Sequence, residues 1–353
     1  MKIVVLAGGL SHERDVSMSS GSQIANALRK AGHRVVLIDV YTGWDGPEPD
    51  ISSDFVFPLE QEAPPYTYVI PEQEPDLDAL RQSSGNGDAL IGPHVLDLCR
   101  AADLVFLGLH GGMGENGMIQ ATLEVMGIRF TGTGYAGCLL AMDKDVSKIL
   151  MRATGVPTPE WAVLEQGDDD TTILSKTEKI GFPCVVKPCS NGSSIGVVMV
   201  NRPEELQDAV RAALRFENRV MVEQKITGRE FSVGVLGGTV LPVIEIAPVE
   251  GFYDYANKYQ IGRVIETCPA ELSEPVATAI QSSALQVGAL LRLGDYYRVD
   301  YLLDADGFHC LEANTLPGMT PASLIPQEAA AVGIGYVELC DRIVRLAYER
   351  RPS

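Results

Sequence analysis

Residues 297–318, YRVDYLLDADGFHCLEANTLPG, contain two β-prone stretches on either side of the turn-forming residues Asp304–Gly307. This pattern predicts two strands, Tyr297–Leu303 and Phe308–Glu312, that pair antiparallel around the turn. Residues two apart on a strand face the same side of it. Polar residues repeated at that spacing therefore gather on one face of the predicted hairpin.

The hairpin carries four such polar residues: Arg298 and Asp300 on its first strand, and Glu312 and Asn314 at the end of its second. Two carboxylates, an amide oxygen and a cation then converge on one patch. Such an oxygen-only ligand set suits Mg²⁺, which keeps waters and takes substrate phosphates as further ligands. The alternative is a surface salt bridge of Arg298 with a carboxylate. The addition of Asn314 favours a metal site formed by Asp300, Glu312 and Asn314.

The chain before this hairpin predicts further antiparallel strands, two of which pair around a Gly-Gly turn. The predicted strands are Cys184–Lys187, Val197–Val200, Val220–Gln224, Phe231–Leu236 and Val240–Ile246. The predicted helices of this half are Pro203–Phe216, Ser273–Leu293 and Tyr336–Arg350. The second half is therefore expected to be of the α+β class.

The N-terminal part has a different pattern, in which short apolar strands alternate with helices. This βαβ start predicts an open parallel sheet, an α/β arrangement with ligands at the carboxyl ends of its strands. The predicted strands are Lys2–Ala7, Arg34–Asp39, Leu104–Leu109 and Arg129–Gly132, and the predicted helices are Ser17–Lys30, Gly117–Met126 and Asp143–Ala153.

An acidic, proline-rich segment interrupts this part of the chain. Residues 39–78 hold eleven acidic residues and no Lys or Arg. Segments of this composition rarely build a core. We interpret residues 42–80 as a surface excursion with a short hairpin; a functional lid is the alternative.

The overall charge limits the class of partner. The chain has 353 residues, 46% of them hydrophobic, and a net charge of −19. This balance argues against a nucleic acid or an anionic membrane as partner, and no apolar run is long enough to span a bilayer. The opening MKIVVLAGG is too short for a signal peptide, and the seven cysteines form no CxxC pair. We expect buried, reduced thiols in a cytoplasmic protein.

Two lysines and a loop of small residues suit a polyphosphate ligand. Lys187 ends a predicted strand just before Gly192-Ser-Ser-Ile-Gly196, and Lys144 starts a predicted helix. Backbone N–H groups of such a loop can close over phosphate oxygens, and lysines supply point charges. The chain has no GxxxxGK[ST] motif, so it is not a P-loop protein. An ordinary turn is the alternative for the loop alone.

The strand end Val222–Ile226 fits the edge of an adenine ring. Glu223 can accept a hydrogen bond from the exocyclic amine, and the backbone from Gln224 to Ile226 can contact the other ring positions. Glu230 can hold the ribose hydroxyls. Taken alone, these residues could equally be ordinary surface charges.

Together and in this order, these residues resemble the ATP-grasp enzymes, and more closely the D-alanine–D-alanine ligases. The resemblance covers nearly the whole chain outside the acidic segment. Its motifs are Gly8-Gly9-x-Ser11-x-Glu13, His110-Gly111-x-x-Gly114-Glu115-x-Gly117, Met142-Asp143-Lys144, Lys187-Pro188, Gly228-Arg229-Glu230-Phe231, Tyr253-Asp254-Tyr255 with Lys258-Tyr259, Arg298-x-Asp300, and Glu312-Ala313-Asn314-Thr315-x-Pro317-Gly318 with Ser323-Leu324.

The resemblance implies a fold and a division into domains. A substrate-binding α/β domain, the pre-ATP-grasp domain, is expected over residues 1–140. A two-lobed ATP-grasp fold is expected to follow, with a central ATP-binding lobe at 141–226 and a C-terminal lobe at 227–353. A lid loop is expected at 250–263, where it would shield an acyl phosphate from water.

The resemblance also implies roles for single residues. ATP would be held by Lys144, Lys187, Ser193, Ser194, Glu223, Gln224, Ile226, Glu230 and Lys258. Two Mg²⁺ ions, which Mn²⁺ can replace, would be bound by Asp300, Glu312 and Asn314. Glu13 would hold the ammonium group of the first D-alanine, Ser323 and Leu324 the carboxylate of the second, and Arg298 and Gly318 the oxyanion. His110 would be a further substrate-binding residue. Glu13, Ser193 and Tyr259 would form a hydrogen-bonded triad that closes the lid. Ser193 and Tyr259 are also candidates for the base that removes a proton from the amine of the second D-alanine.

The implied reaction joins two D-alanines through an acyl phosphate, with ATP as co-substrate, for peptidoglycan precursor synthesis in a cytoplasmic homodimer. A ligase that takes D-lactate or D-serine as second substrate is one alternative. A nucleotide-binding module without ligase activity is another, although it would be expected to lack some of the metal ligands.

Overall fold

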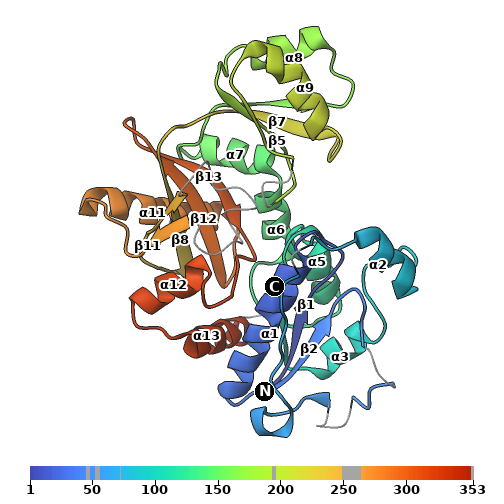
Figure 1. Cartoon of the computed structure of the whole chain (residues 1–353). Helices are drawn as coiled ribbons and strands as arrows, with labels where there is room; N and C mark the ends of the chain where they lie inside the picture. Colours follow the sequence, from blue (N-terminus) through green and yellow to red (C-terminus); the bar gives the residue numbers. More distant parts are fainter. Residues whose placement is uncertain (45–47, 52–55, 72, 193–195, 249–263, 351–353) are drawn as a thin grey trace.

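The structure is a computed structural model of the chain, and it describes residues 1–44, 48–51, 56–71, 73–192, 196–248 and 264–350. Three β-sheets follow one another along the chain, each with helices packed against it (Figure 1). All seven cysteines are free, as predicted, and all but Cys268 are buried. Among the described residues, no helix has the length and apolar character needed to cross a bilayer.

The first sheet is parallel, as predicted. Strand β1 (Lys2–Ala7) lies between β2 (Arg34–Asp39) and β3 (Leu104–Leu107). Helix α1 (Arg14–Lys30) packs on β1 and β2, and α13 (Tyr336–Glu349), from the other end of the chain, lies beside α1 (Figure 1). The apolar runs of these strands are buried because helices cover them.

The acidic segment packs onto α1 instead of forming the expected hairpin. Its described residues contain a short 3₁₀ helix, η2 (Glu60–Glu62), and α2 (Leu77–Ser84), and no strand pair. The backbone of Tyr66 exchanges two hydrogen bonds with the side chain of Asn26, and the Arg29 guanidinium lies 4.2 Å from the Tyr66 ring centre. The backbone of Tyr66 is therefore bonded to a side chain of α1 and not to a second strand.

The second sheet is antiparallel and has the order β4-β7-β5-β6. Its strands are β4 (Trp161–Glu165), β5 (Cys184–Pro188), β6 (Val198–Val200) and β7 (Arg219–Gln224). Helices α8 (Asp170–Thr177) and α9 (Pro203–Ala213) pack against it. The strand β4 and the helix α8 were not predicted from the sequence.

The third sheet has the order β11-β10-β8-β12-β13, with β9 added to β8. Its strands are β8 (Arg229–Leu236), β9 (Thr239–Val240), β10 (Ile244–Pro248), β11 (Val264–Thr267), β12 (Tyr296–Leu303) and β13 (Phe308–Asn314). Helix α11 (Glu274–Leu290) covers one face, where Val233, Val299 and Tyr301 are buried. The opposite face of β8, β12 and β13 carries the polar residues of the predicted site.

Two predicted strands are wrong. Val240–Ile246 is not one strand, because it splits into β9 and β10 around Pro242, which has no N–H to donate to a sheet. The segment Arg129–Gly132 contributes a single bridge, between Phe130 and Val105.

The remaining helices are spread over the molecule, from the side of the first sheet to one end of the third (Figure 1). They are α3 (Val95–Ala101), α4 (Gly112–Glu115), α5 (Met118–Val125), α6 (Tyr135–Met142), α7 (Lys144–Ala153) and α12 (Leu324–Ala331).

Candidate active site

The β12–β13 hairpin brings its four predicted polar residues together. Asp300 lies directly opposite Glu312, and Arg298 lies opposite Asn314. The register shifts between Asp300 and the next residue, so that Leu311 is an extra residue in β13. This bulge changes which side of β13 faces the site, as bulges commonly do.

The Asp300 carboxylate is the centre of this face. Its Oδ1 accepts hydrogen bonds from Ser232 Oγ at 2.6 Å and from Arg298 Nε at 2.9 Å. Its Oδ2 accepts from Arg298 Nη2 at 2.9 Å and from Asn314 Nδ2 at 2.8 Å. One carboxylate therefore connects side chains from β8, β12 and β13.

The donor set at this face fits Mg²⁺. Asp300 and Glu312 supply two carboxylates from paired positions, and Asn314 supplies an amide whose oxygen can face an ion once the amide is turned. Within the described residues, no group of three His, Cys, Asp or Glu side chains forms a metal cluster. Two carboxylates and one amide would fill only some of the ligand positions around Mg²⁺, and this ion commonly keeps waters or phosphate oxygens at the others.

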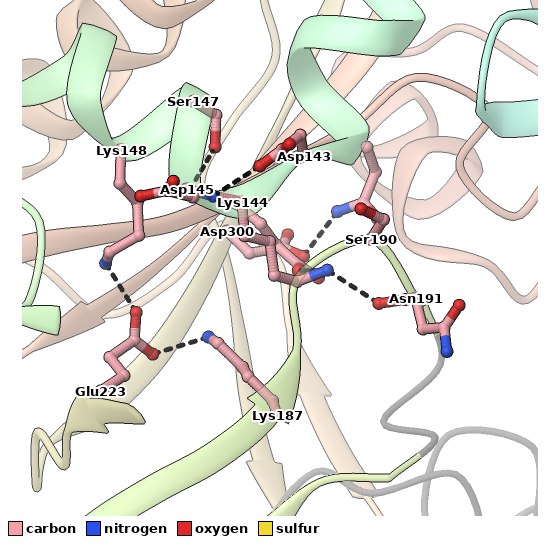
Figure 2. A network of polar contacts seen from close by, with 12 residues as sticks. Asp143, Lys144, Asp145, Ser147, Lys148, Lys187, Ser190, Asn191, Glu223 and Asp300 are labelled. Atoms are coloured by element: carbon pink, nitrogen blue, oxygen red, sulfur yellow. Dashed lines mark hydrogen bonds and ion pairs between the residues drawn. The ribbon is translucent and has the colours of Figure 1, made fainter. Parts of the chain in front are cut away.

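Lys144 connects this face to the loop of small residues. Its Nζ donates to the carbonyl of Asn191 at 2.8 Å, and it lies 3.4 Å from Glu312 Oε2 (Figure 2). Lys144 is the first residue of α7, and its backbone N–H donates to the carbonyl of Cys189. The predicted phosphate-binding lysine thus contacts both Asn191, which precedes the loop, and Glu312, one of the predicted metal ligands.

Glu223 is held between two lysines in a buried row (Figure 2). Its Oε1 lies 2.6 Å from Lys148 Nζ, and its Oε2 lies 2.6 Å from Lys187 Nζ. Burial alone would raise the pKa of Glu223, but Lys187 and Lys148 hold it below its usual value. Burial likewise would lower the pKa of Lys187, and the carboxylates of Glu223 and Glu312 raise it.

Lys148 was missed by the sequence analysis, although its side chain is fully buried. Its Nζ also donates to Thr158 Oγ1 at 2.6 Å, and burial lowers its pKa. The available signal was its position four residues after Lys144, which places both lysines on one face of the helix. The sequence could not show that Glu223 would accept from Lys148.

Two carboxyls from the first sheet's carboxyl edge face the same loop. Glu13 precedes α1 and is 8% exposed, while Glu115 ends α4. A Cβ placed on Gly192 would lie 3.7 Å from Glu115 Oε2 and 3.9 Å from Glu13 Oε2. Burial raises the pKa of Glu115 to about 8, and the Glu13 charge adds to this effect. Glu115 therefore holds a proton at neutral pH, beside the residue predicted to bind an ammonium group.

His110 is neutral and fixed by two hydrogen bonds, in agreement with a hydrogen-bonding rather than a catalytic role. Its Nδ1 lies 3.2 Å from the carbonyl of Leu316, and its Nε2 lies 3.1 Å from Ser20 Oγ. Because a carbonyl only accepts, Nδ1 carries the proton. Burial lowers the pKa of His110 below its ordinary value.

The predicted acceptor residues gather at the start of α12. Ser323 is the N-cap residue, and its Oγ accepts the N–H of Thr320 at 3.1 Å. Leu324 is the first residue of the helix, and a Cβ on Gly318 would lie 2.9 Å from Ser323 Oγ. Gly318, Ser323 and Leu324 therefore share one corner, where the N-terminus of a helix favours an anion.

The remaining predicted residues fall into two groups. Ser193, Ser194, Lys258, Tyr259 and the lid 250–263 lie outside the described residues. Gln224 is exposed and Ile226 is half-buried at the end of β7, and Glu230 lies on β8 on the same side as Ser232.

Two family models cover most of the chain: "D-ala D-ala ligase N-terminus" matches residues 2–133, and "D-ala D-ala ligase C-terminus" matches residues 150–345. The chain belongs to the D-alanine–D-alanine ligase family. A relative from Pediococcus pentosaceus named D-alanine–D-alanine ligase is 43% identical over 348 residues, which are 98% of this chain and 97% of the relative. One of that name from Lacticaseibacillus casei is 40% identical, over 98% of this chain and 95% of the relative.

Solved structures of the family agree with the fold. The D-alanine–D-alanine ligase from Bacillus anthracis complexed with ATP matches with a TM-score of 0.75 and 28% sequence identity. The match covers 98% of this chain and 97% of that one. The predicted fold, a parallel-sheet part followed by an ATP-grasp fold with antiparallel sheets, is therefore confirmed.

The proton on Glu115 predicts a pH dependence of stability. The pKa of Glu115 is higher in the folded chain than its ordinary value of 4.5. Its stabilising contribution is therefore complete below pH 4.5 and is lost as the pH rises through about 8. Glu115→Gln, which stays neutral, should make the free energy of unfolding fall less steeply between about pH 5 and 8.

Urea unfolding of both proteins at several pH values checks this expectation. Glu204→Gln, at an exposed position of α9, is the control and should keep the wild-type slope. Equal slopes for wild type and Glu115→Gln would show that Glu115 is ionised in the folded chain.

Proposed function

We propose that this member of the family ligates two D-alanines to D-alanyl-D-alanine, with ATP converted to ADP and phosphate. The observation that carries the proposal is the convergence of Lys144, Glu312 and Asp300 on one face of the third sheet. The names of the relatives support D-alanine as substrate. The product would enter peptidoglycan precursor synthesis in the cytoplasm.

In the first half of the reaction, a carboxylate oxygen of the first D-alanine attacks the γ-phosphorus of ATP, and ADP leaves. Lys144 and Lys187 would hold the phosphates, and Glu13 the ammonium group of the D-alanine. Negative charge accumulates on the phosphates during the transfer. Asp300, Glu312 and Asn314 would hold Mg²⁺, which when bound offsets part of that charge.

In the second half, the amine of the second D-alanine, after losing a proton, attacks the acyl carbon, and phosphate leaves. Ser323 and the Leu324 backbone N–H would bind its carboxylate at the N-terminus of α12. Arg298 and the Gly318 N–H would donate to the oxyanion. The removal of one such donor typically costs about 2.7–4 kcal/mol of transition-state stabilisation.

The proposal predicts a choice among acceptors. With ATP and Mg²⁺, D-alanine alone should release ADP and give the dipeptide, and D-lactate or D-serine should add little product. A coupled ADP assay with chromatography of the products measures both, and EDTA should abolish turnover. Depsipeptide formation with D-lactate in preference to dipeptide, or ATP binding without any ADP release, would contradict the proposal.

The buried row of charges predicts an effect on ATP binding. Lys187 must turn from Glu223 to reach a phosphate, and Lys148 then remains to balance the carboxylate. Lys148→Met should keep Lys187 on Glu223 and weaken ATP binding roughly tenfold, about 1.4 kcal/mol. Calorimetry with ATP and Mg²⁺ measures this change.

Two further variants serve as a control and a rescue for the Lys148→Met experiment. Lys176→Met, which removes a half-exposed ion pair with Asp168 in the same lobe, should bind ATP as the wild type does. The double variant Lys148→Met/Glu223→Gln should recover part of the lost affinity, because Glu223 no longer attracts Lys187. Wild-type affinity in Lys148→Met would contradict the proposed exchange of partners.

We also propose that the chain forms a homodimer through the exposed face of α5 and α6. Met118 and Val125 on α5 are 53% and 90% exposed, and Tyr135 and Leu139 on α6 are 50% and 59% exposed. Each pair is spaced to lie on one side of its helix. The two helices contact each other, and we propose that these side chains together form the surface that a second copy buries.

Val125→Glu should shift the protein towards monomer, because it places a charge on the proposed contact surface. Sedimentation velocity at micromolar concentration measures the shift. Leu174→Glu, at a 48% exposed apolar position on α8, is the control and should leave the dimer unchanged. A monomeric wild type, or equal dissociation of all three proteins, would reject this surface.

A further inference from the structure

Glu328 on α12 is a buried carboxyl that the reaction described above does not use. It is 0% exposed, and its Oε2 accepts the backbone N–H of Gly234 at 2.9 Å. Its Oε1 has no hydrogen-bond partner among the described residues. Burial raises the pKa of Glu328 well above its ordinary value, and the nearby Arg298 guanidinium opposes this shift. A carboxyl buried at such a cost indicates a specific role.

The bond to Gly234 fills a gap at the edge of β8. Residues 230–232 of β8 pair with β10, and residues 235 and 236 pair with β9. Gly234 lies between these two pairings. Its carbonyl accepts the N–H of Leu241, while its N–H donates to Glu328. The helix therefore supplies an acceptor for a backbone donor that neither neighbouring strand reaches.

Only a glycine at position 234 allows the Glu328 carboxyl to come this close to β8. A Cβ on Gly234 would overlap Glu328 Oε2 and would lie 3.0 Å from Ile325 Cγ1. Both contacts come from α12, so the missing side chain sets how close α12 lies to β8. Figure 1 shows α12 at this end of the third sheet.

The same bond connects the two ends of the acyl-transfer site. Gly234 lies opposite Arg298 in the β8–β12 pairing. Glu328 lies four residues after Leu324, and residues at this spacing share one face of a helix. The helix that begins at the acceptor corner is thus connected by a buried hydrogen bond to β8, at the residue that pairs with Arg298.

We propose that Glu328 is a positioning residue for the second half of the reaction, which fixes the N-terminus of α12 relative to Arg298. This inference rests on the proposed function. Without the bond, the acceptor carboxylate is held at a shifted position relative to the acyl carbon. A misplacement of about 1 Å can reduce a rate by about 10²-fold. The first half of the reaction uses Lys144, Lys187 and the β12–β13 hairpin, and is expected to be unaffected.

The test separates the two halves of the reaction in Glu328→Ala. Dipeptide formation over a wide range of D-alanine concentrations gives the KM of each D-alanine site. Positional isotope exchange in ATP with the first D-alanine reports acyl phosphate formation alone. We expect the KM of the second D-alanine to rise about tenfold or more and kcat to fall, with isotope exchange and the KM of ATP within about twofold of wild type.

Three further variants keep the test specific. Glu328→Gln should recover near wild-type values, because its amide oxygen still accepts the Gly234 N–H. Gly234→Ala should reproduce the defect by displacing the carboxyl. The double variant Gly234→Ala/Glu328→Ala should be no worse than Glu328→Ala, since the overlap is then removed and the two effects are not additive.

The matched control is Gln281→Ala. Gln281 connects α11, on the opposite face of the third sheet, to the carbonyl of Leu241 at 2.8 Å. Its removal loosens the neighbouring backbone without touching α12, so both KM values for D-alanine should stay as in the wild type.

Several results would overturn the inference. An equal rise in the KM of ATP and of both D-alanines, or a lower melting temperature with unchanged kinetics, would assign Glu328 a structural role only. If Glu328→Ala does not fold, wild-type kinetics in Gly234→Ala would reject the proposal. A wild type that makes no dipeptide at all would instead show that the proposed function is wrong.

Discussion

The rest of the site depends on the hydrogen bonds that the Asp300 carboxylate accepts. It accepts hydrogen bonds from Ser232, Arg298 and Asn314 and so connects three strands of the third sheet. The bulge at Leu311 makes this possible. Without it, strict alternation would place Cys310 and Glu312 on one face; with it, Cys310 packs in the core under α11 while Glu312 faces Asp300. One extra residue in a strand thus separates the core from the site.

Charge balance explains how a chain with a net charge of −19 can hold an anionic co-substrate. A few well-placed cations are enough, and each of them lies next to a carboxylate. Lys187 rests on Glu223 and Lys144 lies near Glu312. A polyphosphate would replace one carboxylate partner of each lysine. The protein therefore avoids unpaired buried charge before the ligand arrives, and the second lysine on Glu223 keeps that carboxylate neutralised afterwards.

Strands and helices could be predicted from the sequence where neighbouring residues alone determine them. The first strand, Lys2–Ala7, is a continuous buried run and was predicted to the residue, while Pro242 broke a strand that its neighbours alone favoured. The polar face formed by Asp300, Glu312 and Asn314 could be predicted because alternation on a strand is also local. The roles of Lys148 and Glu328 could not be predicted, because each depends on contact with a partner far along the chain. A lysine or glutamate on a predicted helix is ordinarily solvated, and only tertiary contact shows that it is buried.

The acceptor corner owes its position to the first sheet as much as to the third. Leu316, Met319 and Ile325, which precede or begin α12, are buried in the same core as β1 and β3. His110 adds a polar connection, since its ring bonds the carbonyl of Leu316. The segment from the β12–β13 hairpin to α12 is therefore held on one side by apolar packing with the first sheet and on the other by the Glu328 bond to β8. A close-packed interior transmits small shifts. A displacement in the first sheet would therefore also displace the start of α12, where the second substrate is proposed to bind.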